Sequence, residues 1–276
     1  MRAALIQMTS SDLPEENIGQ VRELVREAAA GGAGMVLTPE VTNCLSTSRD
    51  WQRNVLTEEA EDPTLAALRQ EAASLGIWLL IGSLGLKTTD PDGRFANRSI
   101  LIEPGGGIVA RYDKIHMFDV EISATETFRE SDGYRPGARA VLAPTPFGAV
   151  GMAICYDLRF AHLFRALAKA GAEILTVPAA FSPVTGAAHW EPLLRARAIE
   201  TGCYVLAPAQ CGLHPASQGQ SRRTHGHSLA VSPWGEVLAD GGEAPGISYV
   251  ELDREEVARA RARVPSITHD RGFEGP

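Results

Sequence analysis

The chain has 276 residues, of which 44% are hydrophobic and 22% charged, and its formal net charge is −8. This composition is typical of a soluble globular protein, and no stretch reaches the ~20 apolar residues that a membrane-spanning helix needs. An acidic chain without a long Lys/Arg cluster also argues against nucleic acid as a partner. We therefore expect one domain over residues 1–276. The apolar part of residues 1–7 is too short for a signal peptide and is typical of a first strand, which indicates a cytoplasmic protein.

Strand-like and helix-like segments alternate along the chain, which predicts an α/β fold. The predicted strands cover residues 3–8, 34–38, 77–84, 97–103, 108–112, 149–154, 173–178, 203–209, 227–231, 236–240 and 247–252. The predicted helices cover residues 15–31, 63–75, 158–171, 187–201 and 254–262. Residues 118–137 are polar and break this rhythm, so we expect a long irregular insertion there, a kind of segment that is usually functional or mobile.

Cys155 lies between an apolar, strand-like run and a helix-like segment that starts at residue 157. Free backbone N–H groups at the start of a helix stabilise a thiolate, so this position predicts a thiol pKa below its usual value of about 8.5. Cysteine is also one of the most buried residue types, and a thiol at a strand end is often only a packing residue. Other residues must therefore decide between a nucleophile and a core side chain.

Glu40 and Lys114 also follow strand-like runs. Because the carboxyl ends of parallel strands meet at one edge of a sheet, the carboxylate, the amine and the thiol of Cys155 are expected to converge in one crevice. The carboxylate would then take the thiol proton, the ammonium would stabilise a substrate oxyanion, and the sulfur would attack a carbonyl or nitrile carbon. The alternatives are a solvated carboxylate in a turn for Glu40 and an exposed charge cluster for Lys114.

Around these residues the sequence resembles the nitrilase superfamily of carbon–nitrogen hydrolases, whose catalytic set is a Glu, a Lys and a Cys in this chain order. The matching segments are residues 37–40 (LTPE), 112–121 (YDKIHMFDVE), 155–160 (CYDLRF), 193–200 (LLRARAIE), 209–212 (AQCG), 226–228 (GHS) and 233–235 (PWG). They cover nearly the whole chain. The resemblance implies a four-layer α-β-β-α sandwich and amide hydrolysis through a thioester on Cys155, without a cofactor.

Further site residues are implied by the same resemblance. A second glutamate from the 118–137 segment lies beside the lysine in relatives, and Glu130 matches that position best, with Glu121 in reserve. The oxyanion would be held by Lys114 and the backbone N–H of Tyr156. No metal is expected, because Cys44, Cys155, Cys203 and Cys211 show no zinc-binding spacing; disulfides are not expected in a cytosolic chain either.

The substrate is predicted from residues around the thiol. The guanidinium fork of Arg159 suits a substrate carboxylate, although a structural salt bridge is an equal alternative. In relatives that act on dicarboxylate amides, positions matching Phe181 and Thr185 also surround that carboxylate. The local wording is nearest to the Nit branch, which includes deaminated glutathione amidase and ω-amidase. Two segments depart from it: residues 160–162 (FAH) and the unusually basic 221–225 (SRRTH).

Several alternatives to a deaminated glutathione amidase remain open at this stage. The chain could be an ω-amidase acting on 2-oxoglutaramate, a nitrilase or an N-carbamoyl amino acid amidohydrolase, all using the same three residues. A catalytically silent binding protein is the non-enzyme alternative. Relatives dimerise through their C-terminal tails, so residues 265–276 are predicted to lie at the interface of a homodimer or higher homo-oligomer.

Overall fold

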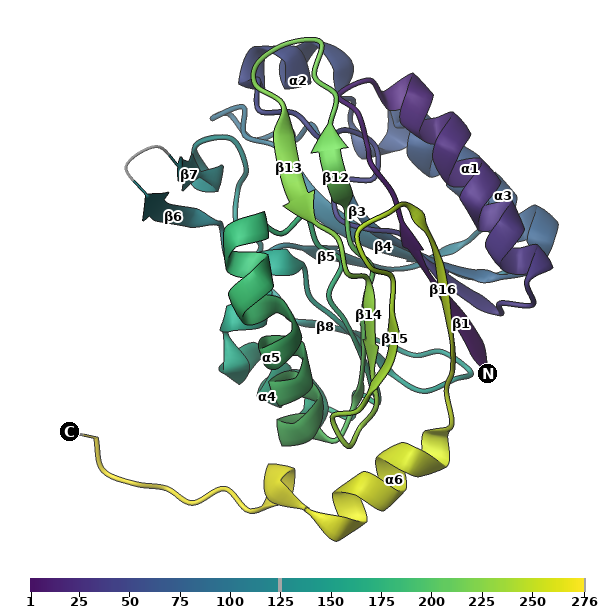
Figure 1. Ribbon diagram of the computed structural model, residues 1–276, viewed down its shortest axis with the longest axis vertical. Coiled ribbons are helices and arrows are strands. Elements are labelled where there is room, and N and C mark those ends of the chain that lie inside the picture. The colour runs from purple at the N-terminus through teal and green to yellow at the C-terminus, as the bar shows by residue number, and fades with distance from the viewer. Residues whose placement is uncertain (124–125, 276) are drawn as a thin grey trace.

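Two six-stranded sheets lie face to face, and helices cover their outer faces (Figure 1). The computed structural model describes residues 1–123 and 126–275. The first sheet has the order β16 (Gly246–Glu251), β1 (Arg2–Gln7), β2 (Met35–Leu37), β3 (Trp78–Leu86), β4 (Ala96–Ile102) and β5 (Ile108–Asp113). The second has the order β15 (Val237–Asp240), β14 (Leu229–Val231), β11 (Tyr204–Ala207), β10 (Ile174–Thr176), β9 (Val150–Met152) and β8 (Val141–Ala143).

Helices pack on both outer faces, so the expected four-layer α-β-β-α sandwich is confirmed. The pair α1 and α3 covers the first sheet, and the pair α4 and α5 covers the second. The helices are α1 (Pro14–Ala30), α2 (Arg49–Val55), α3 (Pro63–Leu75), α4 (Ala161–Lys169), α5 (Pro183–Thr201) and α6 (Arg254–Arg263). None of the helices in the described residues is long and apolar enough to span a membrane.

Two apolar cores follow from the alternation of side chains along the strands. On β1, Ala3 and Leu5 pack between the two sheets, whereas Ala4 and Ile6 pack between the first sheet and its helices. All four side chains are fully buried. Successive residues of a strand point to opposite faces, so a strand covered on both faces reads as a continuous apolar run.

Most predicted elements form within a few residues of their expected bounds, but three parts of the chain differ. The helix predicted from residue 158 begins at Ala161, because a tight 3-10 turn over Cys155–Arg159 comes first. The 118–137 segment is not irregular throughout: β6 (Asp119–Ser123) and β7 (Glu126–Arg129) form a hairpin, followed by a 3-10 turn. The elements α2 and β8 and the hairpin of β12 (Cys211–His214) and β13 (Arg222–His225) were not predicted.

Strand direction brings the candidate residues to one place. Strands β1, β2 and β3 are parallel to one another, and so are β9, β10 and β11. Strand β5 runs in the direction of β3, because both are antiparallel to β4. Glu40, Lys114 and Cys155 follow the carboxyl ends of β2, β5 and β9, at the same end of the sandwich.

The C-terminal tail extends from α6 along the outside of the body (Figure 1). Asp270 pairs with Arg165 and Lys169 of α4, which attaches the first part of the tail to the surface. Phe273 beyond it is 91% exposed. A role of this tail in oligomerisation stays a prediction.

Candidate active site

A buried carboxylate and a buried ammonium group form the centre of the site. The Lys114 Nζ lies 2.9 Å from Oε1 of Glu40, and both side chains are almost fully buried. The second oxygen of Glu40 accepts a hydrogen bond of 2.8 Å from the backbone N–H of Ala180, and Oε1 accepts one of 2.9 Å from Asn97. Glu40 follows a strand of the first sheet and Ala180 follows β10 of the second, so the carboxylate joins the two sheets.

Glu130, and not Glu121, contacts the lysine. Its two carboxylate oxygens lie 2.9 and 2.8 Å from the Lys114 Nζ, and Oε2 also accepts a 2.7 Å hydrogen bond from the backbone N–H of Phe118. Glu121 is exposed on β6. The 3-10 turn after β7 therefore places Glu130 so that Lys114 lies between two carboxylates.

Cys155 lies on a sharp turn at the end of β9. Its φ is +48°, in the left-handed region that residues other than glycine rarely adopt, and such a conformation persists only where surrounding contacts hold it. The fully buried Asp157 provides such contacts. Its carboxylate accepts hydrogen bonds from Ile154 N–H at 2.9 Å, the Tyr112 hydroxyl at 2.6 Å and the His116 N–H at 3.0 Å. The thiol is thus fixed in place by a buried carboxylate two residues further on.

The sequence-based prediction of a lowered thiol pKa is wrong. Burial, followed by the negative charge of Glu40, raises the pKa of Cys155 well above its usual value, although Lys114 acts in the opposite direction. The buried surroundings thus outweigh any stabilisation from the turn, and the resting sulfur is a neutral thiol. It must therefore lose its proton to a base as it attacks.

Glu40 has the properties of that base. Burial alone would raise its pKa, but the charge and hydrogen bond of Lys114 lower it below its usual value, assisted by hydrogen bonds from Asn97 and the Cys155 thiol. Burial also acts to lower the pKa of Lys114, but Glu130 and Glu40 raise it well above its usual value. At neutral pH the site therefore holds an ionised acid, a charged lysine and a protonated thiol.

An oxyanion position follows from the donors near the sulfur. The backbone N–H of Tyr156 has no acceptor among the described residues, so it is available to a substrate oxygen. The Lys114 ammonium is the second donor at this position, where it already serves two carboxylates. Donors of this kind stabilise the negative charge of a tetrahedral intermediate.

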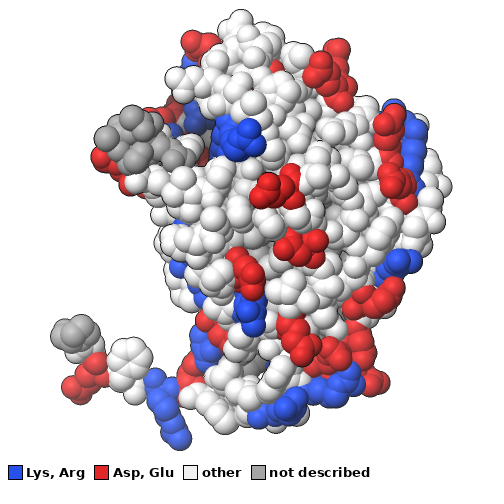
Figure 2. Space-filling view, in the orientation of Figure 1, with Lys and Arg blue, Asp and Glu red and all other residues white. Residues whose placement is uncertain are grey.

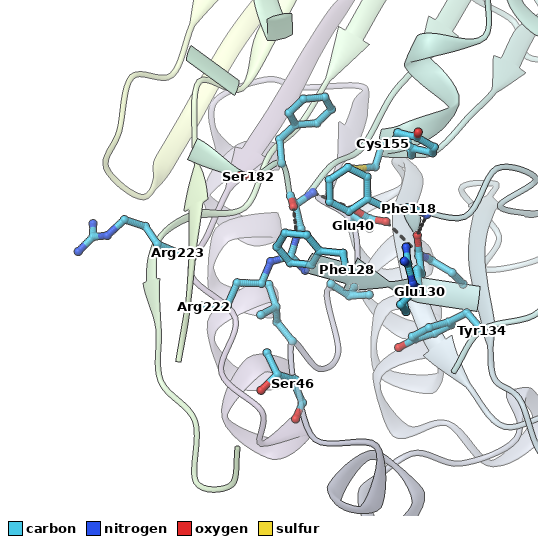
Figure 3. A pocket seen from close by; sticks show the side chains of 18 of the residues that line it. Glu40, Ser46, Phe118, Phe128, Glu130, Tyr134, Cys155, Ser182, Arg222 and Arg223 are labelled. Atoms are coloured by element: carbon cyan, nitrogen blue, oxygen red, sulfur yellow. Dashed lines mark hydrogen bonds between the residues drawn. The ribbon is translucent and has the colours of Figure 1, made fainter. Parts of the chain in front are cut away.

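These residues open into a cavity of about 710 Å³ (Figure 3). Phe181 and Thr185 both line it. Arg159 is not among the lining residues in the described part of the chain: its guanidinium stacks on Phe181 at 5.5 Å and lies 3.3 Å from His189. Neither the expected carboxylate contact nor a salt bridge to a helix is formed there, and its role in substrate binding stays a prediction.

Sequence reasoning missed several residues of the site. Asn97 on β4 holds Glu40, and Arg222 on β13 enters the cavity from a different part of the chain. The basic 221–225 segment was noticeable in the sequence, but its partner in space was not. The described cysteines are all buried free thiols, and no group of three or more His, Cys, Asp or Glu in residues 1–123 and 126–275 could hold a metal ion.

The fold and this set of side chains define a class of enzyme, a thiol-dependent hydrolase built on an α-β-β-α sandwich. The carbon–nitrogen hydrolase family model matches residues 2–262, so the chain belongs to the carbon–nitrogen hydrolase family. It is an amidase of the Nit branch of the nitrilase superfamily, as its relatives indicate.

Two relatives are called deaminated glutathione amidase. The Mus musculus protein is 41% identical over 97% of this chain and 82% of its own length. The Yersinia enterocolitica protein is 38% identical over 97% of this chain and 92% of its own length. The crystal structure of the C. elegans NitFhit protein has a TM-score of 0.90 and 35% identity, covering 98% of this chain and 65% of that one. This chain thus spans less than two thirds of the NitFhit chain.

Proposed function

We propose that this amidase uses Cys155 as its nucleophile and Glu40 as general acid and base, and that its substrate is deaminated glutathione. The observation that carries the catalytic part is the buried Glu40–Lys114 pair, 2.9 Å apart, beside a thiol on a turn with positive φ. The substrate is inferred from the names of the relatives and from the size of the cavity.

Acylation begins with a proton transfer. As the Cys155 sulfur attacks the amide carbon, its proton passes to Glu40, and the carbonyl oxygen becomes an oxyanion held by Lys114 and the Tyr156 N–H. The tetrahedral intermediate collapses when Glu40 gives this proton to the amide nitrogen. The C–N bond breaks, the amine leaves, and the acyl group remains on sulfur as a thioester.

Deacylation repeats the sequence with water. Glu40, again ionised, takes a proton from a water molecule as its oxygen attacks the thioester carbon. The same donors hold the second oxyanion. The C–S bond then breaks, the proton returns to the sulfur, and the carboxylic acid leaves. With deaminated glutathione the products are 2-oxoglutarate and the dipeptide Cys-Gly.

Glu130 supports this cycle through the lysine. Its two contacts with Lys114 keep the ammonium charged and in position through each proton transfer of Glu40. When Glu40 is neutral, Glu130 still balances the charge of the lysine. Glu130 is therefore a positioning residue in this mechanism.

The test is hydrolysis by the purified protein and by Cys155→Ala. The substrates are deaminated glutathione, 2-oxoglutaramate, an N-carbamoyl amino acid and a simple nitrile. The proposal expects Cys155-dependent turnover that is fastest with the first. A preference for another substrate would keep the mechanism and reject the substrate, whereas no turnover of any would favour a silent binding protein.

We also infer that the protein is a cytoplasmic homodimer or higher homo-oligomer. Exposed apolar side chains on neighbouring surface elements support an interface, among them Val184 and Ile199 of α5, which are 59% and 55% exposed. Sedimentation velocity of the full chain and of a variant ending at residue 264 would test the predicted role of the tail.

A further inference from the structure

The cavity is basic although the chain is acidic. Five basic side chains and three acidic ones line it, in a protein whose formal net charge is −8. Two of the acids, Glu40 and Glu130, are bound to Lys114. Figure 2 shows basic side chains beside the hollow between β13 and the β6–β7 hairpin. An anionic ligand group fits this end of the cavity better than a neutral one.

Arg222 is the basic residue best placed to bind such a group. It is half-buried, its guanidinium stacks on the Phe128 ring at 5.4 Å, and one Nη donates a 2.6 Å hydrogen bond to the Ala180 carbonyl. Its Nε has no acceptor and it forms no ion pair with any described residue. A guanidinium held in this way keeps unused donors, which suit a carboxylate.

The position of Arg222 relative to Glu40 indicates which half of the substrate it meets. Ala180 connects the two: its N–H binds Glu40 at 2.8 Å and its carbonyl binds Arg222. In Figure 3 Cys155 and Glu130 lie on one side of Phe128 and Arg222 on the other. Because Glu40 protonates the leaving nitrogen, the amine half extends from Glu40 toward Arg222.

We propose that Arg222, with Arg223 at the cavity mouth, binds a carboxylate carried by the amine half of the substrate. The inference rests on the proposed function, in which that amine is a dipeptide ending in a carboxylate. Arg159, behind Phe181, is then left for the acyl half. The basic 221–225 segment acquires a function as the part of the chain that selects a dipeptide amine over ammonia.

The test compares deaminated glutathione with its analogue whose terminal glycine carboxylate is a neutral amide. The readout is the ratio of kcat/KM for the two substrates, measured within each variant, so that general damage to the enzyme cancels. The wild-type protein should prefer the acid by about 10- to 100-fold, the usual effect of a hydrogen bond to a charged group. Arg222→Met should bring the ratio close to one, and Arg222→Lys should restore part of it.

Arg139→Met is the matched control, because Arg139 is exposed and does not line the cavity. It should keep the wild-type ratio. A wild-type ratio close to one, or a ratio unchanged in Arg222→Met, would overturn the inference while leaving the proposed function intact. Absence of any turnover of deaminated glutathione would instead reject both.

Discussion

Replacing Glu130 by glutamine removes one charge from the site without changing the size of the side chain. In the structure its two oxygens contact the Lys114 Nζ at 2.9 and 2.8 Å, and Oε2 also accepts from the Phe118 N–H. A glutamine has one acceptor oxygen in place of two and adds a donor. At least one of these charge-assisted contacts is therefore lost, and either Lys114 or the Phe118 N–H faces an NH₂ group.

The magnitude follows from these contacts. Hydrogen bonds to charged groups contribute about 1.5–3 kcal/mol each, so Glu130→Gln should lower the free energy of unfolding by about 2–4 kcal/mol. Lys114 then acts on Glu40 alone and makes it a weaker base. General base catalysis contributes about 10²–10⁴-fold, and losing part of it should lower kcat by about 10- to 100-fold.

The assay combines urea unfolding with steady-state kinetics on one amide substrate, using Cys155→Ala as the blank. Glu121→Gln is the matched control, since it removes the same charge from an exposed position on the neighbouring strand. It should change the free energy of unfolding by about 0.5 kcal/mol at most and leave kcat unaltered. Equal effects of the two variants, or wild-type kcat in Glu130→Gln, would refute the reasoning.

Three further predictions concern the same site. Glu40→Gln should abolish alkylation of Cys155 by iodoacetamide at pH 7, because a thiol with a raised pKa needs the base; mass spectrometry that finds wild-type labelling would contradict this. The raised Cys155 pKa favours folding below the unfolded value of about 8.5, and this contribution falls by about 1.4 kcal/mol per pH unit above it. Urea midpoints should therefore fall more steeply above that pH in wild type than in Cys155→Ser, and parallel curves would reject the argument. Asp157→Asn should lower the free energy of unfolding by about 3 kcal/mol, and Tyr112→Phe by about 1 kcal/mol, because only the former leaves buried N–H groups unpaired; calorimetry would detect equal losses.

Local sequence signals predicted the parts of the fold that depend on local interactions. Helix α3 forms over the predicted 63–75 because Asp62 caps it, with its side chain accepting from Leu65 N–H at 2.7 Å, and Gly76 ends it at a φ of +66°. Helix α2 had a comparable signal that was overlooked: the Ser48 hydroxyl accepts a hydrogen bond from Trp51 N–H.

The parts that were missed depend on contacts between distant segments. The thiol pKa was predicted from its neighbours in the chain, but burial between two sheets decides it. Arg222 reaches the cavity because β13 lies beside the segment after β10, where His225 N–H binds the Phe181 carbonyl at 2.9 Å. Strand order and the resemblance to a family could place Glu40, Lys114 and Cys155 together, but the surroundings of each charge required the whole structure.

The acid and the thiol belong to different sheets, and this division links activity to the alignment of the two layers. Glu40 follows β2, Cys155 follows β9, and the hydrogen bond from Ala180 to Glu40 spans the gap between them. A small slip of one layer over the other would separate the two groups while every strand kept its own hydrogen bonds. On heating, hydrolysis should therefore stop before the circular dichroism of the sheets changes, so that the enzyme reports on its own core packing.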